Sequence, residues 1–169
     1  VVVPLDRQLP VNEIKNCLKR AEVTAVVYSG KLDDKISEVE KELDTVKVFI
    51  GMDLKEDNEK YLSLNKLIAK GKELVASGDK RFIDAKIDEE AMSELLFTSG
   101  TTSESKAVML SHKNLAFNIE KQCMMLEIVP EDTFLSMLPI HHVYECVCGF
   151  LTPLYRGASV AYCEGLKYI

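Results

Sequence analysis

One segment of the sequence concentrates hydroxyl side chains, a glycine and a lysine between two apolar stretches. It runs from Leu95 to Val108 and reads LLFTSGTTSESKAV. Hydroxyl groups and backbone N–H groups can converge on phosphate oxygens, and a lysine adds a positive charge. In α/β proteins, such loops lie at the carboxyl ends of parallel strands, where ligands bind. The segment therefore predicts a loop that holds an oxyanion.

Two familiar kinds of catalytic loop are excluded for this segment. Gly100 and Lys106 have the spacing of a Walker A loop, but Ser105 replaces its second glycine and Ala107 its metal-binding Ser or Thr. No G-x-S-x-G elbow occurs in the sequence, so Ser99 lacks the setting of a hydrolase nucleophile. On composition alone an ordinary polar turn stays open, because serine and threonine are common in loops.

Histidine and cysteine side chains gather in a second segment, but their spacing does not suit a metal. His141, His142, Cys146 and Cys148 match none of the usual zinc-ligand patterns. On a helix, Cys146 and Cys148 would point about 200° apart. We therefore expect no metal site. The odd count of five cysteines without a CxxC pair favours a reducing cytoplasm over a disulfide framework.

The composition is that of a globular protein with unevenly distributed charge. Of the 169 residues, 47% are hydrophobic and 28% charged, which excludes a disordered or collagen-like chain. The net charge of −6, without a basic cluster, argues against nucleic-acid binding. Residues 1–90 carry 35 charged side chains and residues 91–169 only 13. This uneven distribution, together with an N-terminal Val1 in place of Met, predicts a piece of a larger protein.

Short apolar runs alternate with amphipathic stretches along the chain. Strands are predicted at residues 23–28, 46–50, 95–98, 133–138 and 158–162. Helices are predicted at residues 12–20 and 33–43, after Ser111, and at 142–154, where Arg156-Gly157 ends the helix. Residues 52–88 are expected to form a surface excursion with one short helix near 61–69. The alternation predicts an α/β fold, a parallel, doubly wound sheet flanked by helices, with residues 1–169 as a single segment.

With these elements in place, the motifs resemble those of the AMP-forming adenylating enzymes. Thr98 to Thr102 read TSGTT, and Lys106 is in register with the lysine of the family's T-S-G-T-T-G-x-P-K-G loop. Val108–Asn114 is similar to the V-x-x-[ST]-H-x-N continuation, and Val3–Asp6 to the stretch before the first helix. Leu138–Glu145 (LPIHHVYE) resembles the next motif, and its glutamate is most like the long-chain fatty acid–CoA ligases. The resemblance spans nearly the whole chain.

The resemblance implies a partial N-terminal AMP-binding domain, without the family's C-terminal domain, and assigns roles to individual residues. It implies that ATP phosphates are held by Thr98, Ser99, Gly100, Thr101, Thr102 and Lys106. It makes His142 the catalytic candidate, beside the substrate carboxylate and the acyl-adenylate. Glu145, Cys148 and Gly149 either border an acyl tunnel or pack in the core.

The implied reaction joins a fatty acid and ATP to give acyl-AMP and pyrophosphate, after which CoA displaces AMP, with Mg²⁺ shielding the phosphates. Peripheral membrane contact of the larger enzyme is left open.

The sequence also departs from the family pattern. Ser103, Ser105 and Ala107 stand where the family has Gly, Pro and Gly, which predicts a loop of altered flexibility. No Tyr-Gly-x-Thr-Glu segment and no C-terminal-domain lysine is found, so we expect the 169-residue chain alone to be inactive. Two alternatives remain, an adenylating enzyme for an aryl or amino acid and a non-catalytic flavodoxin-like binding module.

Overall fold

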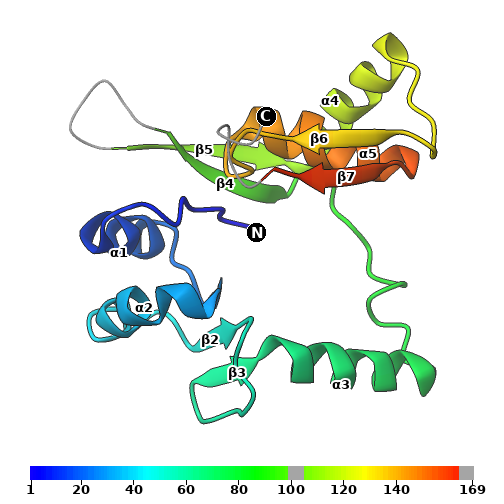
Figure 1. Cartoon of the computed structure of the whole chain (residues 1–169). Coiled ribbons are helices and arrows are strands. Elements are labelled where there is room, and N and C mark those ends of the chain that lie inside the picture. The colour runs from blue at the N-terminus through cyan, green and yellow to red at the C-terminus, as the bar shows by residue number, and fades with distance from the viewer. Residues whose placement is uncertain (99–104, 164–169) are drawn as a thin grey trace. The chain divides into compact units, whose positions relative to one another are not determined.

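The chain folds into two compact units. The computed structural model describes residues 1–98 and 105–163. The N-terminal unit is Arg7–Ile87, and the C-terminal unit combines Val1–Asp6 with Asp88–Ile169. Figure 1 labels their helices and strands. Among the described residues, no helix is long and apolar enough to cross a bilayer.

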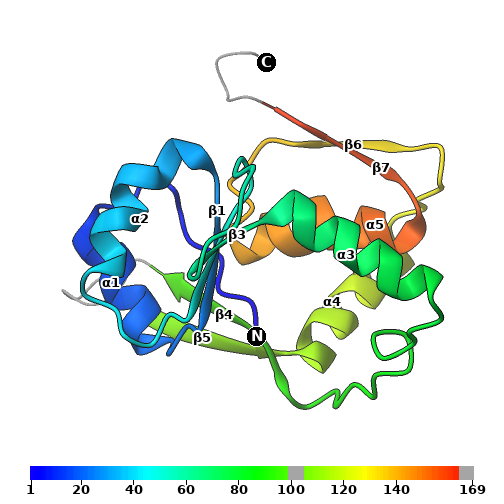
Figure 2. The same ribbon diagram turned by 90° about the horizontal axis from the view of Figure 1, so that it is seen from below.

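The N-terminal unit is built on a parallel sheet with the strand order β1-β2-β3. Its strands are β1 (Ala25–Tyr28), β2 (Val48–Gly51) and β3 (Tyr61–Ser63), and its helices are α1 (Val11–Arg20), α2 (Asp33–Glu40) and α3 (Leu64–Ala76), with a 3₁₀ turn, η1 (Gly30–Leu32). Helices α1 and α2 lie side by side (Figures 1 and 2). Val39 of α2 and Phe49 of β2 are fully buried in this unit. The helices predicted at 12–20 and 33–43 are therefore present.

The helix predicted near residues 61–69 begins later than expected because its first residues form a strand. Tyr61 pairs with Phe49 across β2 and β3, and the two rings stack with centroids 5.2 Å apart. The helix α3 starts only after Ser63, whose side chain accepts a hydrogen bond from the Lys66 backbone N–H. Pairing with a neighbouring strand, which local periodicity does not encode, decides this boundary.

In the C-terminal unit the predicted phosphate loop connects two antiparallel strands. They are β4 (Met92–Thr98) and β5 (Lys106–Ser111), paired from Met92–Ser111 to Thr98–Lys106. The sequence predicted this loop at the carboxyl end of a parallel strand, whereas β4 pairs antiparallel with β5, a strand that was not predicted. A short loop can join antiparallel strands, whereas parallel strands need a crossover of a dozen residues or more. Val2 adds a parallel bridge to Glu94 at the other edge of β4.

The rest of the C-terminal unit is a parallel strand pair with a helical crossover. Helix α4 (His112–Met125) starts with a capping box between Ser111 and Asn114. Strands β6 (Thr133–Ser136) and β7 (Ser159–Tyr162) are joined through a π-helix, η2 (Glu145–Leu151), and α5 (Thr152–Arg156). Gly157 ends α5 with a φ of 77°, which suits glycine. The predicted α/β architecture with parallel strands and flanking helices is thus confirmed, with the β4–β5 hairpin as its exception.

Candidate functional site

The base of the predicted phosphate loop is closed by Thr98 and Lys106. These residues are direct partners at the end of the β4–β5 ladder. The Thr98 hydroxyl donates a hydrogen bond to the Lys106 carbonyl oxygen, 3.5 Å away, and both residues are exposed. Ser99, Gly100, Thr101 and Thr102, the other predicted phosphate-binding residues, lie outside the described residues. The structure thus places Thr98 beside the backbone of Lys106, eight positions further along the sequence.

Lys106 lies on the face of the hairpin that also carries Leu110. Directly opposed residues of an antiparallel pair project to the same face, and every second residue of a strand shares that face. The pairs Thr98–Lys106 and Glu94–Leu110 therefore lie on one face of β4 and β5. Four residues of extended strand separate Lys106 from Leu110, or about 13 Å. The base of the loop and Leu110 thus share one face of the β4–β5 pair.

Leu110 lines a mainly apolar groove within the C-terminal unit. The groove has a volume of about 320 Å³, at the lower end of the range for small-molecule sites. It is lined by Leu110, Asn114, Leu115, Asn118, Gln122, Val143, Tyr144, Val147 and Cys148.

Only one of the three predicted tunnel residues lines this groove. Cys148 does so, while Glu145 and Gly149 do not belong to its wall. Leu115 lies in the helix predicted after Ser111. Val143 and Val147 lie four positions apart in the helix predicted at 142–154, and this spacing was the sequence pattern that could have placed them on one face. The amide of Gln122 is held in place by the Thr152 hydroxyl, which donates to its Oε1 at 3.1 Å.

His142 lies in the exposed turn that leads into η2. Its backbone N–H donates to the Pro139 carbonyl oxygen, and its own carbonyl accepts from the Cys146 N–H, each at 3.0 Å. The ring of His141 lies beside that of His142 with centroids 4.4 Å apart. Burial and the neighbouring His142 lower the pKa of His141, and Asp6, 3.9 Å from its Nε2, opposes them. Of the two histidines, His142 is the exposed one, and it precedes two groove-lining residues.

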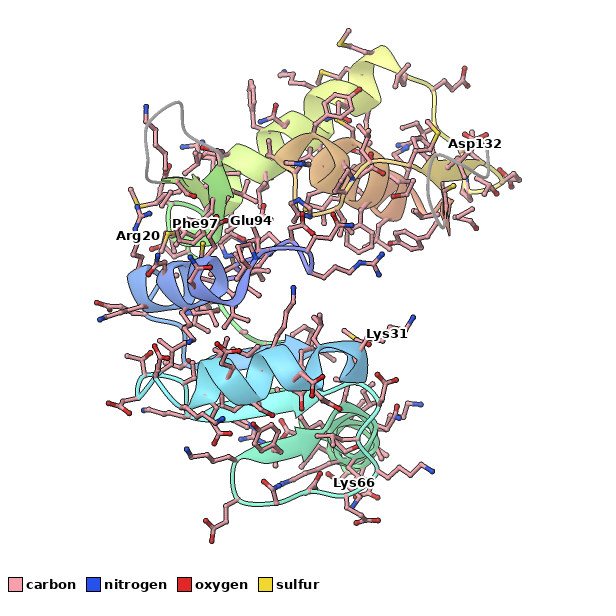
Figure 3. All side chains as sticks on the ribbon, turned by 60° about the vertical axis from the view of Figure 1, so that its left-hand side comes forward. Arg20, Lys31, Lys66, Glu94, Phe97 and Asp132 are labelled. Atoms are coloured by element: carbon pink, nitrogen blue, oxygen red, sulfur yellow. The ribbon has the colours of Figure 1, made fainter. Side chains whose placement is uncertain are left out.

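A buried carboxyl group lies where β4 contacts η2. Glu94, labelled in Figure 3, is 4% exposed, and its Oε1 accepts a hydrogen bond from the Cys146 Sγ at 3.7 Å. Its other oxygen, Oε2, is buried without a hydrogen-bond partner. Burial raises the pKa of Glu94, although the bond from Cys146 lowers it. Burial and the Glu94 carboxylate raise the pKa of the Cys146 thiol to about 11, so this thiol is a poor nucleophile.

Replacing Glu94 with glutamine is expected to stabilise the protein at neutral pH and to leave its stability nearly unchanged in acid. A raised pKa means that the folded state binds more protons than the unfolded state as the pH rises above the ordinary value of 4.5. Stability therefore falls as the pH rises through that window, and a glutamine side chain, which cannot ionise, escapes the loss. Thermal unfolding from mildly acid to neutral pH measures the effect. Glu120→Gln on the exposed side of α4 is the control, and equal pH profiles for wild type and Glu94→Gln would contradict the expectation.

Neither a metal centre nor a disulfide is present in the described part of the chain. No group of three or more His, Cys, Asp and Glu side chains there is placed to hold a metal ion. None of the five cysteines, all of which lie in the described ranges, is joined in a disulfide. Within the described residues, the candidate functional groups are therefore the side chains of Lys106, Thr98 and His142, together with the groove.

The chain matches known proteins along almost its full length. The model of the AMP-binding enzyme family matches residues 1–167. A "CoA ligase" from Gibberella moniliformis is 31% identical over 163 residues, covering 96% of this chain and 24% of the relative. The "Long chain acyl-CoA synthetase 6, peroxisomal" of Arabidopsis thaliana is 33% identical over 106 residues, 63% of this chain and 14% of the relative.

A solved structure shows the same fold. The anthranilate CoA ligase AuaEII, in complex with anthranoyl-AMP, superimposes with a TM-score of 0.78 at 18% identity, over 95% of this chain and 30% of that one. The fold is therefore that of the adenylating enzymes, a class of ligases. The chain belongs to the AMP-binding enzyme family. It spans about a quarter of the length of the first relative.

Proposed function

We propose that the protein containing this chain is an ATP-dependent acid–thiol ligase that activates a fatty acid as acyl-AMP and transfers the acyl group to CoA. The observation that carries the proposal is the shared face of the hairpin, which joins the Thr98–Lys106 pair to the groove at Leu110. Two relatives whose names include CoA ligase and long-chain acyl-CoA synthetase support it. The anthranilate ligase, which has the same fold, keeps an aryl acid as the second candidate substrate.

In this proposal the loop stabilises charge on ATP. An attacking carboxylate and the phosphates repel each other, so a fixed cation lowers the barrier to their reaction. We assign the Lys106 ammonium and the Thr98 hydroxyl to the β- and γ-phosphates of ATP, because these two residues are paired at the ends of β4 and β5 that flank the loop. Ser99, Gly100, Thr101 and Thr102 complete the loop, as the family resemblance implies. When bound, Mg²⁺ would supply further charge neutralisation, and we assign none of this chain's residues to it.

In this proposal the groove and His142 bind the carboxylic acid, which is the second reactant. The apolar wall formed by Leu110, Leu115 and Val147 suits the alkyl part of an acid. The exposed imidazole of His142 donates a hydrogen bond to the carboxylate and later to the acyl-adenylate. We also propose a reducing, cytoplasmic location, because five cysteines without a CxxC pair do not suit a disulfide framework.

The function is tested by pyrophosphate release from the complete protein with ATP and Mg²⁺. Release is expected with octanoate or palmitate, and an acyl-CoA product is expected once CoA is added. Anthranilate and phenylalanine test the aryl and amino-acid alternatives. Fatty-acid activation is contradicted by release with those acids alone, and a binding module is indicated by ATP binding without release.

The 169-residue chain by itself is the matched control in this experiment. It is expected to release no pyrophosphate above background, because the Tyr-Gly-x-Thr-Glu segment and the C-terminal lysine of the family do not occur in its sequence. Robust acyl-AMP formation by this chain would show that those groups are dispensable.

A further inference from the structure

The carboxylate of Glu145 is buried at the first residue of the π-helix η2. The residue is 5% exposed, as is Ser136 at the end of β6. The Ser136 hydroxyl donates a hydrogen bond to Glu145 Oε1 at 2.5 Å. A buried carboxylate is costly unless hydrogen bonds hold it, so this contact fixes the position of the side chain. This hydrogen bond therefore connects η2 to β6.

Gly149 leaves the space in which this carboxylate lies. A Cβ atom at position 149 would be 2.5 Å from Glu145 Oε1, 2.6 Å from its Cδ and 3.0 Å from its Oε2. These distances are shorter than ordinary carbon–oxygen and carbon–carbon contacts. Any other residue at position 149 must therefore displace the carboxylate. The sequence left open whether Gly149 borders an acyl tunnel or packs in the core, and in the structure the Glu145 carboxylate occupies the space beside it.

The next residue ties η2 to a second strand. The Cys146 Sγ donates to Glu94 Oε1 on β4 at 3.7 Å. Two consecutive residues thus connect η2 to β6, which leads toward His142, and to β4, which leads into the predicted phosphate loop. The residues on either side of this pair, Tyr144 and Val147, line the groove. A displacement of η2 therefore moves one wall of the groove and the turn that carries His142.

We propose that Glu145 is a positioning residue for the carboxylic acid substrate. Held by Ser136 in the space beside Gly149, its carboxylate fixes the turn before η2 and the groove wall that η2 provides. This inference rests on the proposed function, since it concerns the carboxylic acid that the proposed ligase would activate. Glu145 itself does not line the groove, so it acts through its neighbours.

The first test compares Glu145→Ala with Glu145→Gln in the complete protein, by carboxylate-dependent ATP–pyrophosphate exchange. Glu145→Ala is expected to lower kcat/KM for the fatty acid about tenfold or more, because small misplacements of reacting groups are costly. The KM for ATP is expected to stay within about twofold, since neither Thr98 nor Lys106 is among the residues that the structure places against the Glu145 carboxylate. Glu145→Gln keeps the shape and an oxygen acceptor for Ser136, and is expected to restore most of the loss. Glu131→Ala, at an exposed position, is the control.

The second test is a double-mutant cycle with Gly149→Ala. Alone, Gly149→Ala is expected to impair use of the acid as much as Glu145→Ala does, because the new methyl displaces the carboxylate. In the Glu145→Ala background the same change is expected to cost about twofold or less, since the obstructing group is gone. Thermal unfolding of the four proteins separates loss of folded enzyme from altered kinetics.

The outcomes distinguish this inference from the function on which it rests. A complete protein without any acid-dependent exchange overturns the proposed function and this role with it. An active wild type overturns only the positioning role if Glu145→Ala leaves the KM and kcat for the acid unchanged. The same conclusion follows if Gly149→Ala is equally harmful in both backgrounds, or if the loss of activity is no larger than the loss of folded protein.

Discussion

Replacing Lys106 with methionine is expected to lower kcat/KM for ATP about a hundredfold in acid-dependent pyrophosphate exchange, the size of effect seen when one fixed charge-stabilising group is removed. Lys106 faces Thr98 at the base of the loop, and methionine keeps most of its length and apolar stem without the charge. The acid attacks the α-phosphate of the same ATP molecule while the β- and γ-phosphates leave, so kcat should fall with either substrate varied. The KM for the acid should change little, because the groove residues are untouched.

The matched control for this prediction is Lys121→Met. Lys121 lies on α4 with its Nζ 5.2 Å from the centroid of the Phe117 ring, and its removal changes the net charge by the same amount. It is expected to leave exchange unchanged. Lys106→Arg should keep part of the activity, since the charge remains while the geometry changes. If Lys106→Met and Lys121→Met behave alike, Lys106 does not hold the phosphates.

Replacing His142 with alanine is expected to lower kcat/KM for the fatty acid about tenfold to a hundredfold. A hydrogen bond from the imidazole to a charged carboxylate or acyl-adenylate contributes about 1.5–3 kcal/mol, and alanine removes the donor. The KM for ATP should stay close to that of wild type, because Lys106 and the loop residues are intact. Kinetics with each substrate varied in turn, together with trapping of acyl-AMP in the absence of CoA, measures the effect.

His141→Ala provides the comparison for His142→Ala. The His141 ring is partly buried and lies 3.9 Å from Asp6, so its loss should lower the unfolding midpoint. The kinetics of the folded fraction should be close to those of wild type. The assignment of His142 fails if His141→Ala impairs use of the acid and His142→Ala does not. His142→Gln, which retains a donor, should recover part of the activity.

Much of the fold could be predicted because its signals are local. The β-branched runs at 23–28, 46–50 and 158–162 contain strands β1, β2 and β7 or most of them, and the spacing of Ile14 and Leu18 belongs to a helix. Ser111 was predicted to cap a helix, and it forms a capping box. Each of these features depends on residues within a few positions of one another. Strands β3 and β5 were missed because they are short or exposed and depend on partners for their pairing.

The candidate site was only partly predictable. Thr98 and Lys106 could be chosen from the sequence because both match a family motif, and the structure adds that they are paired across β4 and β5. The groove was not foreseen as a whole, since its walls come from β5, α4, η2 and the segment before η2. The filling of the space at position 149 was also missed. A small residue predicts free space, but the sequence does not tell which neighbour fills that space.

By itself, the sequence determined the α/β class and the family and predicted a phosphate-binding loop, because motif spacing and hydrophobic periodicity are properties of the chain alone. Only the tertiary structure decided which groups meet. Ser136 contacts Glu145 from nine positions away, and Glu94 contacts Cys146 across 52. Such contacts form when packing brings distant elements together, and their energies depend on burial, which no local pattern specifies. The loop could therefore be identified from the sequence, whereas the hydrogen bonds that connect η2 to β4 and β6 could be identified only from the tertiary structure.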